Sequence, residues 1–383
     1  MGANILNVGT EAKKLIHLEA ARGIASIIVI FNHFSLAFTP WLRAPVLNGG
    51  IKFTPLFPLM NGFGAVTFFF VLSGFVLSCQ FFRHPTANAL ERSVIKRLPR
   101  LLIPASVTIF LGLFILKVLP ANYVTAGEIT GSKWLSSFAD AKFPQNFMPS
   151  ISSALEQCLY VFILPDNYYY NSNLWTMVNE FYGSMLVFFL CAASCWLEKR
   201  GLLVLMATLS MSCFVAHPPF VPFVAGCVVA YYYSKGTRWR MSQRAVIAAT
   251  ALAVVCFSME QSLLQIAGSV ILMLLLLGND TVATRLSSRM GSFLGLLSFP
   301  IYLVHSLVIV SISSFFFLWL HDQQIPYWGV LIITLIVTLI SSIVLSAPLI
   351  LLEGIWIPFL NSVMKKMSFP WAFPQNGNAT ENA

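Results

Sequence analysis

The sequence predicts an all-α fold: a polytopic membrane helix bundle of about ten transmembrane helices, with both termini in the cytoplasm. Hydrophobic residues make up 57% of the 383 residues and charged residues only 10%, whereas a soluble domain carries about 25% charged residues. Long apolar runs also recur along the chain. Because so few charges cannot cover a water-facing surface, the apolar segments are expected to lie in a lipid bilayer.

The basic residues lie between the apolar runs. The formal net charge is +9, which on a soluble protein would favour a nucleic-acid partner. Here the basic residues form short clusters that separate apolar segments, and this pattern is typical of membrane topology. No nucleic-acid partner is therefore expected.

Six apolar runs approach or exceed the roughly 17–20 residues needed to cross hydrocarbon. They are Leu18–Phe38, Ala65–Phe82, Leu101–Leu119, Leu174–Leu197, Phe293–Leu320 and Gly329–Leu352. Residues 202–277 hold two further apolar stretches, on either side of the basic loop 235–244. Each stretch is expected to cross twice, with turns at His217-Pro218-Pro219 and Glu260-Gln261.

The distribution of positive charge predicts the orientation. With ten spans, 18 of the 23 Lys and Arg residues fall on one side of the membrane and 5 on the other. Because Lys and Arg are enriched in cytoplasmic loops, the richer side is expected to be cytoplasmic. Residues 1–367 are then one transmembrane domain, and residues 368–383 are expected to be a disordered cytoplasmic tail.

The longest outer loop, residues 120–173, is expected to contain an interfacial helix that roofs an outer vestibule. Apolar residues recur there at helical spacing, and Ser153 with Glu156 offers a capping box at the helix start. The recurring positions are Ile151, Leu155, Leu159 and Phe162. Aromatic residues at the predicted outer interface, Tyr168–Tyr170 and Trp175, fit a membrane belt.

Ionisable residues inside apolar spans are costly unless they are paired or functional. Arg22 and His33 are eleven residues apart on the first span. At about 100° and 1.5 Å per residue, they lie within about 20° of the same helix face and roughly 16 Å apart. Asn32 adjoins His33. One helix face therefore carries a cation near the cytoplasmic mouth and an imidazole deeper in the membrane.

Glu180 and His305 are expected at about the same depth as His33, in the outer half of the hydrocarbon. Two imidazoles and one carboxylate from three helices at one level indicate an active site. The alternatives are structural. A membrane histidine is often packed against a backbone carbonyl, and in the structural alternative Glu180 serves only to neutralise Arg22 or a histidine.

A second cluster, Arg92-Ser-Val-Ile-Lys-Arg-Leu-Pro-Arg100, lies at the cytoplasmic end of the third span. Arg97 and Arg100 share a face if this segment is helical, and paired guanidiniums suit phosphate oxygens. The alternative is anchoring by positive charge and anionic lipid headgroups.

The glycines and the cysteines are given structural roles in helix packing. The glycines of residues 62–75, with Ser73, allow close helix approach. The seven cysteines show no metal-ligand spacing, so no metal site is expected.

Together these motifs resemble the membrane acyltransferase 3 family, which includes O-antigen acetylases and Nod-factor acetyltransferases. The resemblance covers Leu18 to about Glu353. It consists of Arg22 with ten residues before His33, Phe-Phe-Val-Leu-Ser-Gly-Phe at 69–75, Arg97-x-x-Arg100, Leu-Trp-x-x-x-x-Glu180, and Ile-Tyr-Leu-Val-His305. The chain departs at Glu353-Gly-Ile, where the family often has Glu-Arg-Pro.

The resemblance implies a bacterial inner-membrane O-acyltransferase. It would move an acyl group, expected to be acetyl, from cytoplasmic acyl-CoA to a hydroxyl of an envelope or exported carbohydrate or glycolipid. Acetyl-CoA is then a co-substrate, and no permanently bound cofactor is expected. Homo-oligomerisation stays open.

The resemblance also assigns roles to residues. Arg22, Arg97 and Arg100 would hold the phosphates of coenzyme A, and Arg22 would also belong to the catalytic set with His33 and Glu180. His33 would act as a general base or carry the acyl group itself, and Glu180 would orient its imidazole. Supporting or acceptor-side roles fall to His305, Tyr302, Trp175, Ser73 and Asn32.

Two other functions fit the same residues. A proton-coupled transporter of an anionic or glycolipid substrate would use the arginines for binding and Glu180 with His33 as a proton relay. A non-catalytic component of an envelope polysaccharide system would tolerate changes at both positions.

Overall fold

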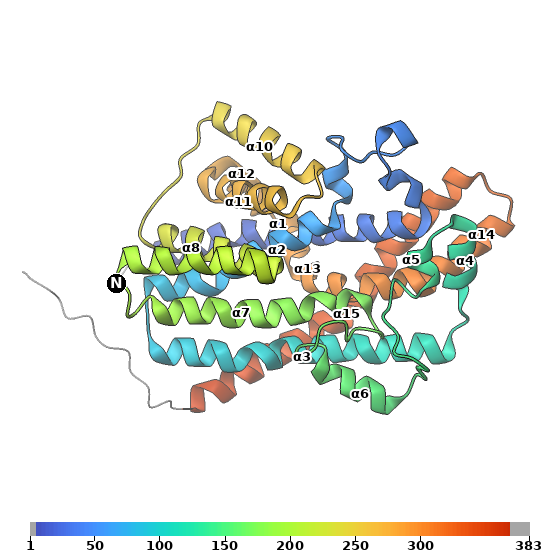
Figure 1. The fold of residues 1–383 in the computed structure, drawn as a ribbon, viewed down its shortest axis with the longest axis horizontal. Coiled ribbons are helices and arrows are strands. Elements are labelled where there is room, and N and C mark those ends of the chain that lie inside the picture. Colours follow the sequence, from blue (N-terminus) through green and yellow to red (C-terminus); the bar gives the residue numbers. More distant parts are fainter. Residues whose placement is uncertain (1–4, 368–383) are drawn as a thin grey trace, which may run out of the picture.

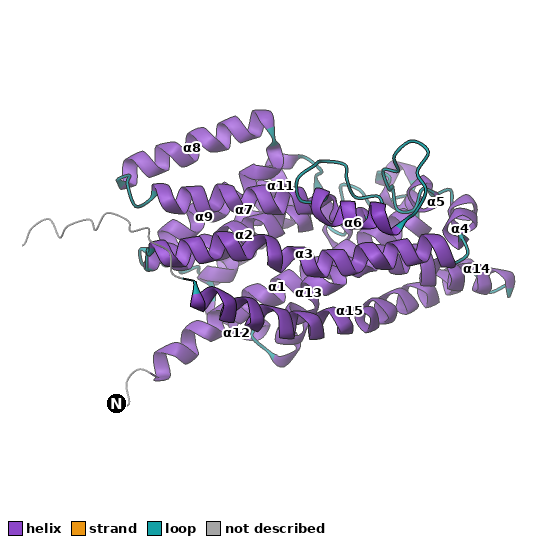
Figure 2. Ribbon diagram, turned by 90° about the horizontal axis from the view of Figure 1, so that it is seen from below, coloured by secondary structure: helices purple, strands orange, loops and turns teal. Residues whose placement is uncertain are grey.

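The computed structural model describes residues 5–367, with side chains from Ile16 onward. All regular elements in this part of the chain are helical, and no strand occurs within it. Figures 1 and 2 show the long helices running roughly side by side along one axis. The all-α prediction is confirmed for these residues, whereas the predicted tail 368–383 lies outside them.

Seven described helices are long and apolar enough to cross a membrane, so the chain is a multi-pass membrane protein. One of them is continuous through α13, a π-helical turn at Ile309–Ser313, and α14. The seven spans are α1 (Ile5–Phe38), α2 (Gly62–Arg83), α3 (Ala87–Val118), α7 (Trp175–Ala193), α8 (Lys199–Ala216), α13 (Arg289–Val308) with α14 (Ser314–Asp322), and α15 (Tyr327–Lys366).

The region from α8 to the start of α13 contains the two predicted hairpins. Its helices after α8 are α9 (Val221–Ser234), α10 (Gln243–Ser258), α11 (Ser262–Gly278) and α12 (Asp280–Leu286). The hairpins are α8 with α9 and α10 with α11. The turns fall at residues 217–220 and 259–261, where Pro and polar residues interrupt the apolar runs. Helices α9 and α10 are short, and α12 bends by 91° from α11. The predicted count of ten spans therefore stays a prediction.

The third helix begins earlier than predicted. It starts at Ala87, not Leu101, because the basic segment 92–100 is itself helical. Pro99 and Pro104 both lie inside this helix. Arg97 and Arg100 consequently lie on one continuous helix with the apolar span, as the phosphate-binding hypothesis requires.

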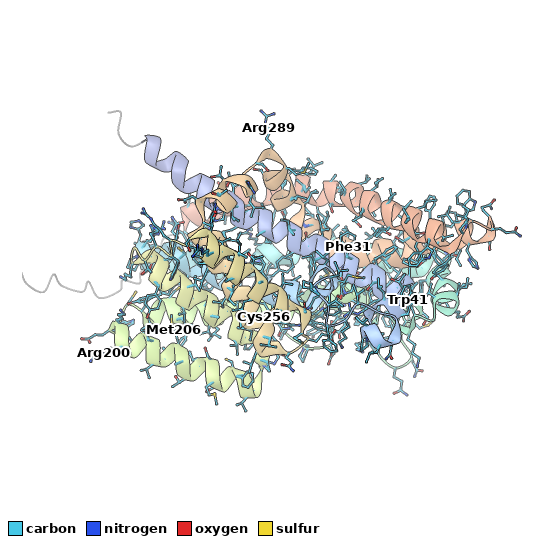
Figure 3. All side chains as sticks on the ribbon, turned by 90° about the horizontal axis from the view of Figure 1, so that it is seen from above. Phe31, Trp41, Arg200, Met206, Cys256 and Arg289 are labelled. Carbon is cyan, nitrogen blue, oxygen red and sulfur yellow. The ribbon has the colours of Figure 1, made fainter. Side chains whose placement is uncertain are left out.

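The two ends of the bundle hold different helices. The start of α1 and the end of α15 lie at one end, and the short helices α4 (Asn122–Thr130) and α5 (Lys133–Ser136) lie at the other with α14 (Figure 1). Arg200 and Trp41 also lie at opposite ends (Figure 3). This separates residues predicted to be cytoplasmic from residues predicted to be outside, although the sidedness itself stays a prediction.

The loop helix α6 (Ile151–Tyr160) forms where helical spacing predicted it, but its cap differs. The N-cap is Ser150, and its partner in the capping box is Ser153, so the predicted Ser153–Glu156 pair is wrong. Ile151, Leu155 and Leu159 are exposed, whereas Ala154 is buried. The helix packs on α3, buries Ala154, Gln157 and Cys158, and leaves its large apolar side chains exposed.

Helices α2 and α9 approach each other through glycines. A Cβ at Gly74 would overlap the carbonyl oxygen of Phe223, and one at Gly226 would overlap that of Val71. The Cys227 thiol contacts the Gly74 carbonyl at 3.7 Å. The close approach inferred from the glycines of residues 62–75 is thus confirmed at Gly74.

Gly74→Ala is expected to lower the free energy of unfolding by about 1–3 kcal/mol, because the added methyl forces the two backbones apart. Gly201→Ala is the control, since its Cβ would meet Leu197 at an ordinary 3.7 Å. Denaturant unfolding in detergent measures both variants. Equal stability of the two would contradict the packing described here.

Candidate active site

Two imidazoles meet inside the bundle. His33 Nδ1 of α1 and His305 Nε2 of α13 are 2.6 Å apart, and their rings are within 10° of parallel. The centroids are 4.9 Å apart, so the rings meet edge to edge through this hydrogen bond. The structure therefore brings together two histidines that are 272 residues apart in the chain.

His305 is fully buried and held by polar groups from the start of α7. The Asn173 amide lies 3.2 Å from His305 Nδ1 and donates at 2.9 Å to the Tyr302 carbonyl. Asn171 donates to the Leu303 carbonyl at 2.8 Å. These bonds join the 3₁₀ turn Ser172–Leu174 to α13 and fix the ring of His305.

The hydrogen bonds of His305 allow two proton arrangements. Its Nδ1 also lies 3.1 Å from the Ile301 carbonyl. If Nδ1 donates to that carbonyl, Nε2 accepts the Nδ1 proton of His33, which leaves His33 Nε2 as a free base. If Nδ1 instead accepts from Asn173, the proton order along the pair reverses.

The outer end of α1, just beyond His33, is fixed by side chains that satisfy its last carbonyls. Ser132 donates to Leu36 at 2.6 Å, Thr130 to Ala37 at 2.8 Å, and Tyr327 to Phe38 at 2.9 Å. Helix ends leave carbonyls unpaired unless such donors are present. The segment that carries His33 is therefore held by both the outer loop and α15.

A cavity of about 170 Å³ lies on the side of these histidines towards the start of α1. One buried water needs only roughly 10–15 Å³ of such volume, so the cavity has room for part of a substrate. Its polar lining comes from six helices, α1, α2, α3, α7, α13 and α15. It consists of Arg22, Ser73, Arg97, Arg100, Thr176, Glu180, Ser298, Tyr302 and Glu353.

Each arginine of the cavity lies near a carboxylate. Arg97 forms an ion pair with Glu180. Arg22 bonds Glu19 at 2.7 Å and donates to the Ser298 hydroxyl at 2.8 Å. Glu353 interacts electrostatically with Arg100 and Arg22. Glu353 lies where the chain departs from the family's usual Glu-Arg-Pro, and the structure places it in the cavity wall.

Glu180 lies away from the imidazole that it was predicted to orient. Its carboxylate bonds Arg97 and, at 2.7 Å, the Ser73 hydroxyl. The side chain of Glu180 thus positions a guanidinium. The group that meets the His33 ring is His305.

A second cavity of about 120 Å³ adjoins the first and shares Leu77, Arg97 and Arg100 with it. Ser93, Lys96 and Asn361 add polar groups, and Lys96 bonds Asn361 at 3.1 Å. This lining holds three cations and no carboxylate among the described residues. Of the two cavities, it is the better match for phosphate oxygens.

Tyr302 connects the first cavity to the histidine pair. Its ring lines the cavity, and the centroid lies 5.9 Å from that of His305. The Tyr302 hydroxyl donates to the Asn173 carbonyl at 3.0 Å. Phe69 packs on the same ring at 6.0 Å. Neither histidine lines the cavity itself, so Tyr302 and Phe69 lie between the cavity and the histidine pair.

The remaining predicted residues lie at the outer side of the pair. The Asn32 amide oxygen accepts from Arg43 and, at 3.3 Å, from the Gly62 backbone. Arg43 also bonds Glu260 at 3.3 Å, which ties the outer loop to the α10–α11 turn. Trp175 packs beside Phe63 and does not line either cavity.

Several site residues escaped the sequence analysis. Asn171 and Asn173 precede α7 in a run of tyrosines and asparagines, and neither Arg43 nor Trp134 was predicted to belong to the site. A pair of asparagines directly before a span was a usable signal, because amides at that point can satisfy a neighbouring helix. Nothing in the local sequence distinguishes Arg43 or Trp134.

A buried set of polar groups inside a multi-pass helix bundle is typical of membrane proteins that handle a substrate within the bilayer. Residues 15–347 match the family model for the acyltransferase domain of the acyltransferase 3 family. The chain therefore belongs to this family, as its motifs predicted, and is a membrane acyltransferase. Comparisons with curated proteins and with solved structures gave no match.

Glu180→Ala is expected to lower the free energy of unfolding by about 3 kcal/mol or more, because the Arg97 guanidinium stays buried without its partner. Adding Arg97→Ala is expected to recover part of the loss. Lys142→Ala, which breaks an exposed pair with Asp140, is the control and changes stability by less than about 0.5 kcal/mol. Additive losses in a double-mutant cycle would argue against the buried pair.

Proposed function

We propose that the protein is a bacterial inner-membrane O-acyltransferase that uses acetyl-CoA, or another acyl-CoA, from the cytoplasm. The acceptor is a hydroxyl of an envelope or exported carbohydrate or glycolipid. The observation that carries this proposal is the arginine-lined cavity that ends at Tyr302, directly beside the His305–His33 pair.

The donor binds along the two joined cavities. Phosphates of coenzyme A bind Arg100, Arg97 and Lys96 in the second cavity, whose lining contains no described carboxylate. Glu180, which pairs with Arg97, lies in the wall of the first cavity. The apolar and thioester part of the donor extends into the first cavity past Arg22. Bidentate bonds from guanidinium to phosphate favour this assignment.

Chemistry takes place at the histidine pair. In direct transfer, His33 removes the proton of the acceptor hydroxyl as its oxygen attacks the thioester carbon. The carbon–sulfur bond breaks, and the thiolate of coenzyme A takes up the proton. His305 holds the His33 ring through Nδ1 and spreads the charge that His33 gains. Tyr302 and Phe69 must turn aside to admit the thioester.

A covalent route uses the same residues. His33 attacks the thioester carbon, the carbon–sulfur bond breaks, and the thiolate of coenzyme A takes the proton that the acyl-imidazolium loses. The acyl group then passes to the acceptor oxygen, and the proton of the acceptor hydroxyl returns to the imidazole. The two routes differ in whether acyl transfer to His33 occurs without an acceptor. A transporter that uses the same groups as a proton relay would consume no acetyl-CoA at all.

Purified protein is expected to release coenzyme A from acetyl-CoA when a glycan extract of the source cells is added. His33→Ala is expected to lower this rate at least about 100-fold, because the base is lost. His84→Ala, an exposed histidine at the end of α2, is the control and keeps full activity. Undiminished transfer by correctly folded His33→Ala would refute both routes.

Arg100→Ala is expected to raise the KM for acetyl-CoA about tenfold with little change in kcat, because a lost charged hydrogen bond weakens donor binding. Lys96→Ala is expected to give a smaller increase. Lys117→Ala, at the opposite end of α3, is the control. A KM equal to that of the wild type for both variants would remove the phosphate site from this cavity.

A further inference from the structure

We propose that Trp134, on the outer-loop helix α5, is a positioning residue that holds the imidazole of His33 in its reactive orientation. The inference rests on the proposed function for the role of His33. It adds a residue from the extracytoplasmic loop, which the family motifs above do not include.

The geometry of the two rings carries the proposal. The centroids of Trp134 and His33 are 5.0 Å apart, and the ring planes differ by 15°. This separation lies within the range in which aromatic rings attract each other. His305 meets His33 at its Nδ1 edge. The imidazole of His33 is therefore held by the hydrogen bond to His305 at one edge and by the nearly parallel indole of Trp134 beside it.

Trp134 can hold the ring because α5 is itself anchored to α1. The Ser132 hydroxyl donates to Leu36 at 2.6 Å and accepts from the Leu135 backbone at 3.0 Å, which caps α5. Leu135 and Phe138 are buried against the outer end of α1. A Cβ at Gly127 would meet Ser136 at 2.7 Å, so α4 and α5 are tightly packed. The indole of Trp134 is thus fixed to α1, the helix that carries His33.

An indole face beside His33 has two effects on the reaction. It limits rotation of the imidazole, so that Nε2 stays directed away from His305. It also attracts the positive charge that the imidazole gains on taking a proton or an acyl group. Both effects act on the chemical step through His33, and the donor-binding cavity lies elsewhere.

Kinetics of three variants test the proposal, with acetyl-CoA as donor and the glycan extract as acceptor. Trp134→Leu is expected to lower kcat about tenfold and leave the KM for acetyl-CoA unchanged. Trp134→Phe keeps an aromatic face and is expected to remain within about threefold of the wild type. Trp319→Leu, an exposed residue of α14, is the control. Wild-type kcat for Trp134→Leu, or an equal loss for Trp134→Phe, would overturn the proposal.

Chemical labelling reads the ring position without any transfer reaction. Diethyl pyrocarbonate carbethoxylates imidazole nitrogen, and peptide mass analysis reports its rate at His33. Trp134→Leu is expected to speed labelling several-fold in the full-length detergent-purified protein, because the ring loses its cover. If Trp134→Leu does not fold, Ser132→Ala carries the test, with about a two- to fivefold increase expected. Unchanged labelling would overturn the inference even if acetyl-CoA proves not to be the donor.

Discussion

The hydrogen bond between His33 and His305 is the interaction on which the arrangement of the site depends. It joins α1 to α13, which pack along their lengths, and it places two titratable rings where water is scarce. A polar group in such surroundings is costly unless every atom has a partner. Asn173 and the Ile301 carbonyl supply partners for His305. The remaining nitrogen of His33 is then the one left for chemistry.

The buried charges of the bundle also need partners. Arg97 and Arg22 have carboxylate partners, and Arg100 lies near Glu353, so the first cavity carries little excess charge. The second cavity shares Arg97 and Arg100 with the first and adds Lys96, and no carboxylate lines it among the described residues. Buried ion pairs add little stability by themselves, but they keep guanidiniums fixed beside the path of an anionic donor. Positioning is therefore the main contribution of Glu180.

The sequence was enough to predict the helical class, the hairpin turns of residues 199–278, and the family. Spacing placed Arg22 and His33 on one helix face and predicted His305 near His33 in depth. It could not pair Glu180 with Arg97, because contacts between helices far apart in the chain depend on rotations that apolar periodicity leaves open. Trp134 was missed for a similar reason, since a four-residue helix in a long loop has no periodicity.

We expect the donor to enter at the end of the bundle where α1 starts, and the acceptor to meet the histidines from the end formed by α4 and α5. Proteoliposomes sorted by orientation test this directly, with radiolabelled acetyl-CoA supplied on one side and the glycan extract on both. Label is expected in glycan only when acetyl-CoA faces the end that holds Arg97 and Arg100. Equal incorporation from either side, or incorporation only from the α4–α5 side, would contradict the path from cavity to imidazole.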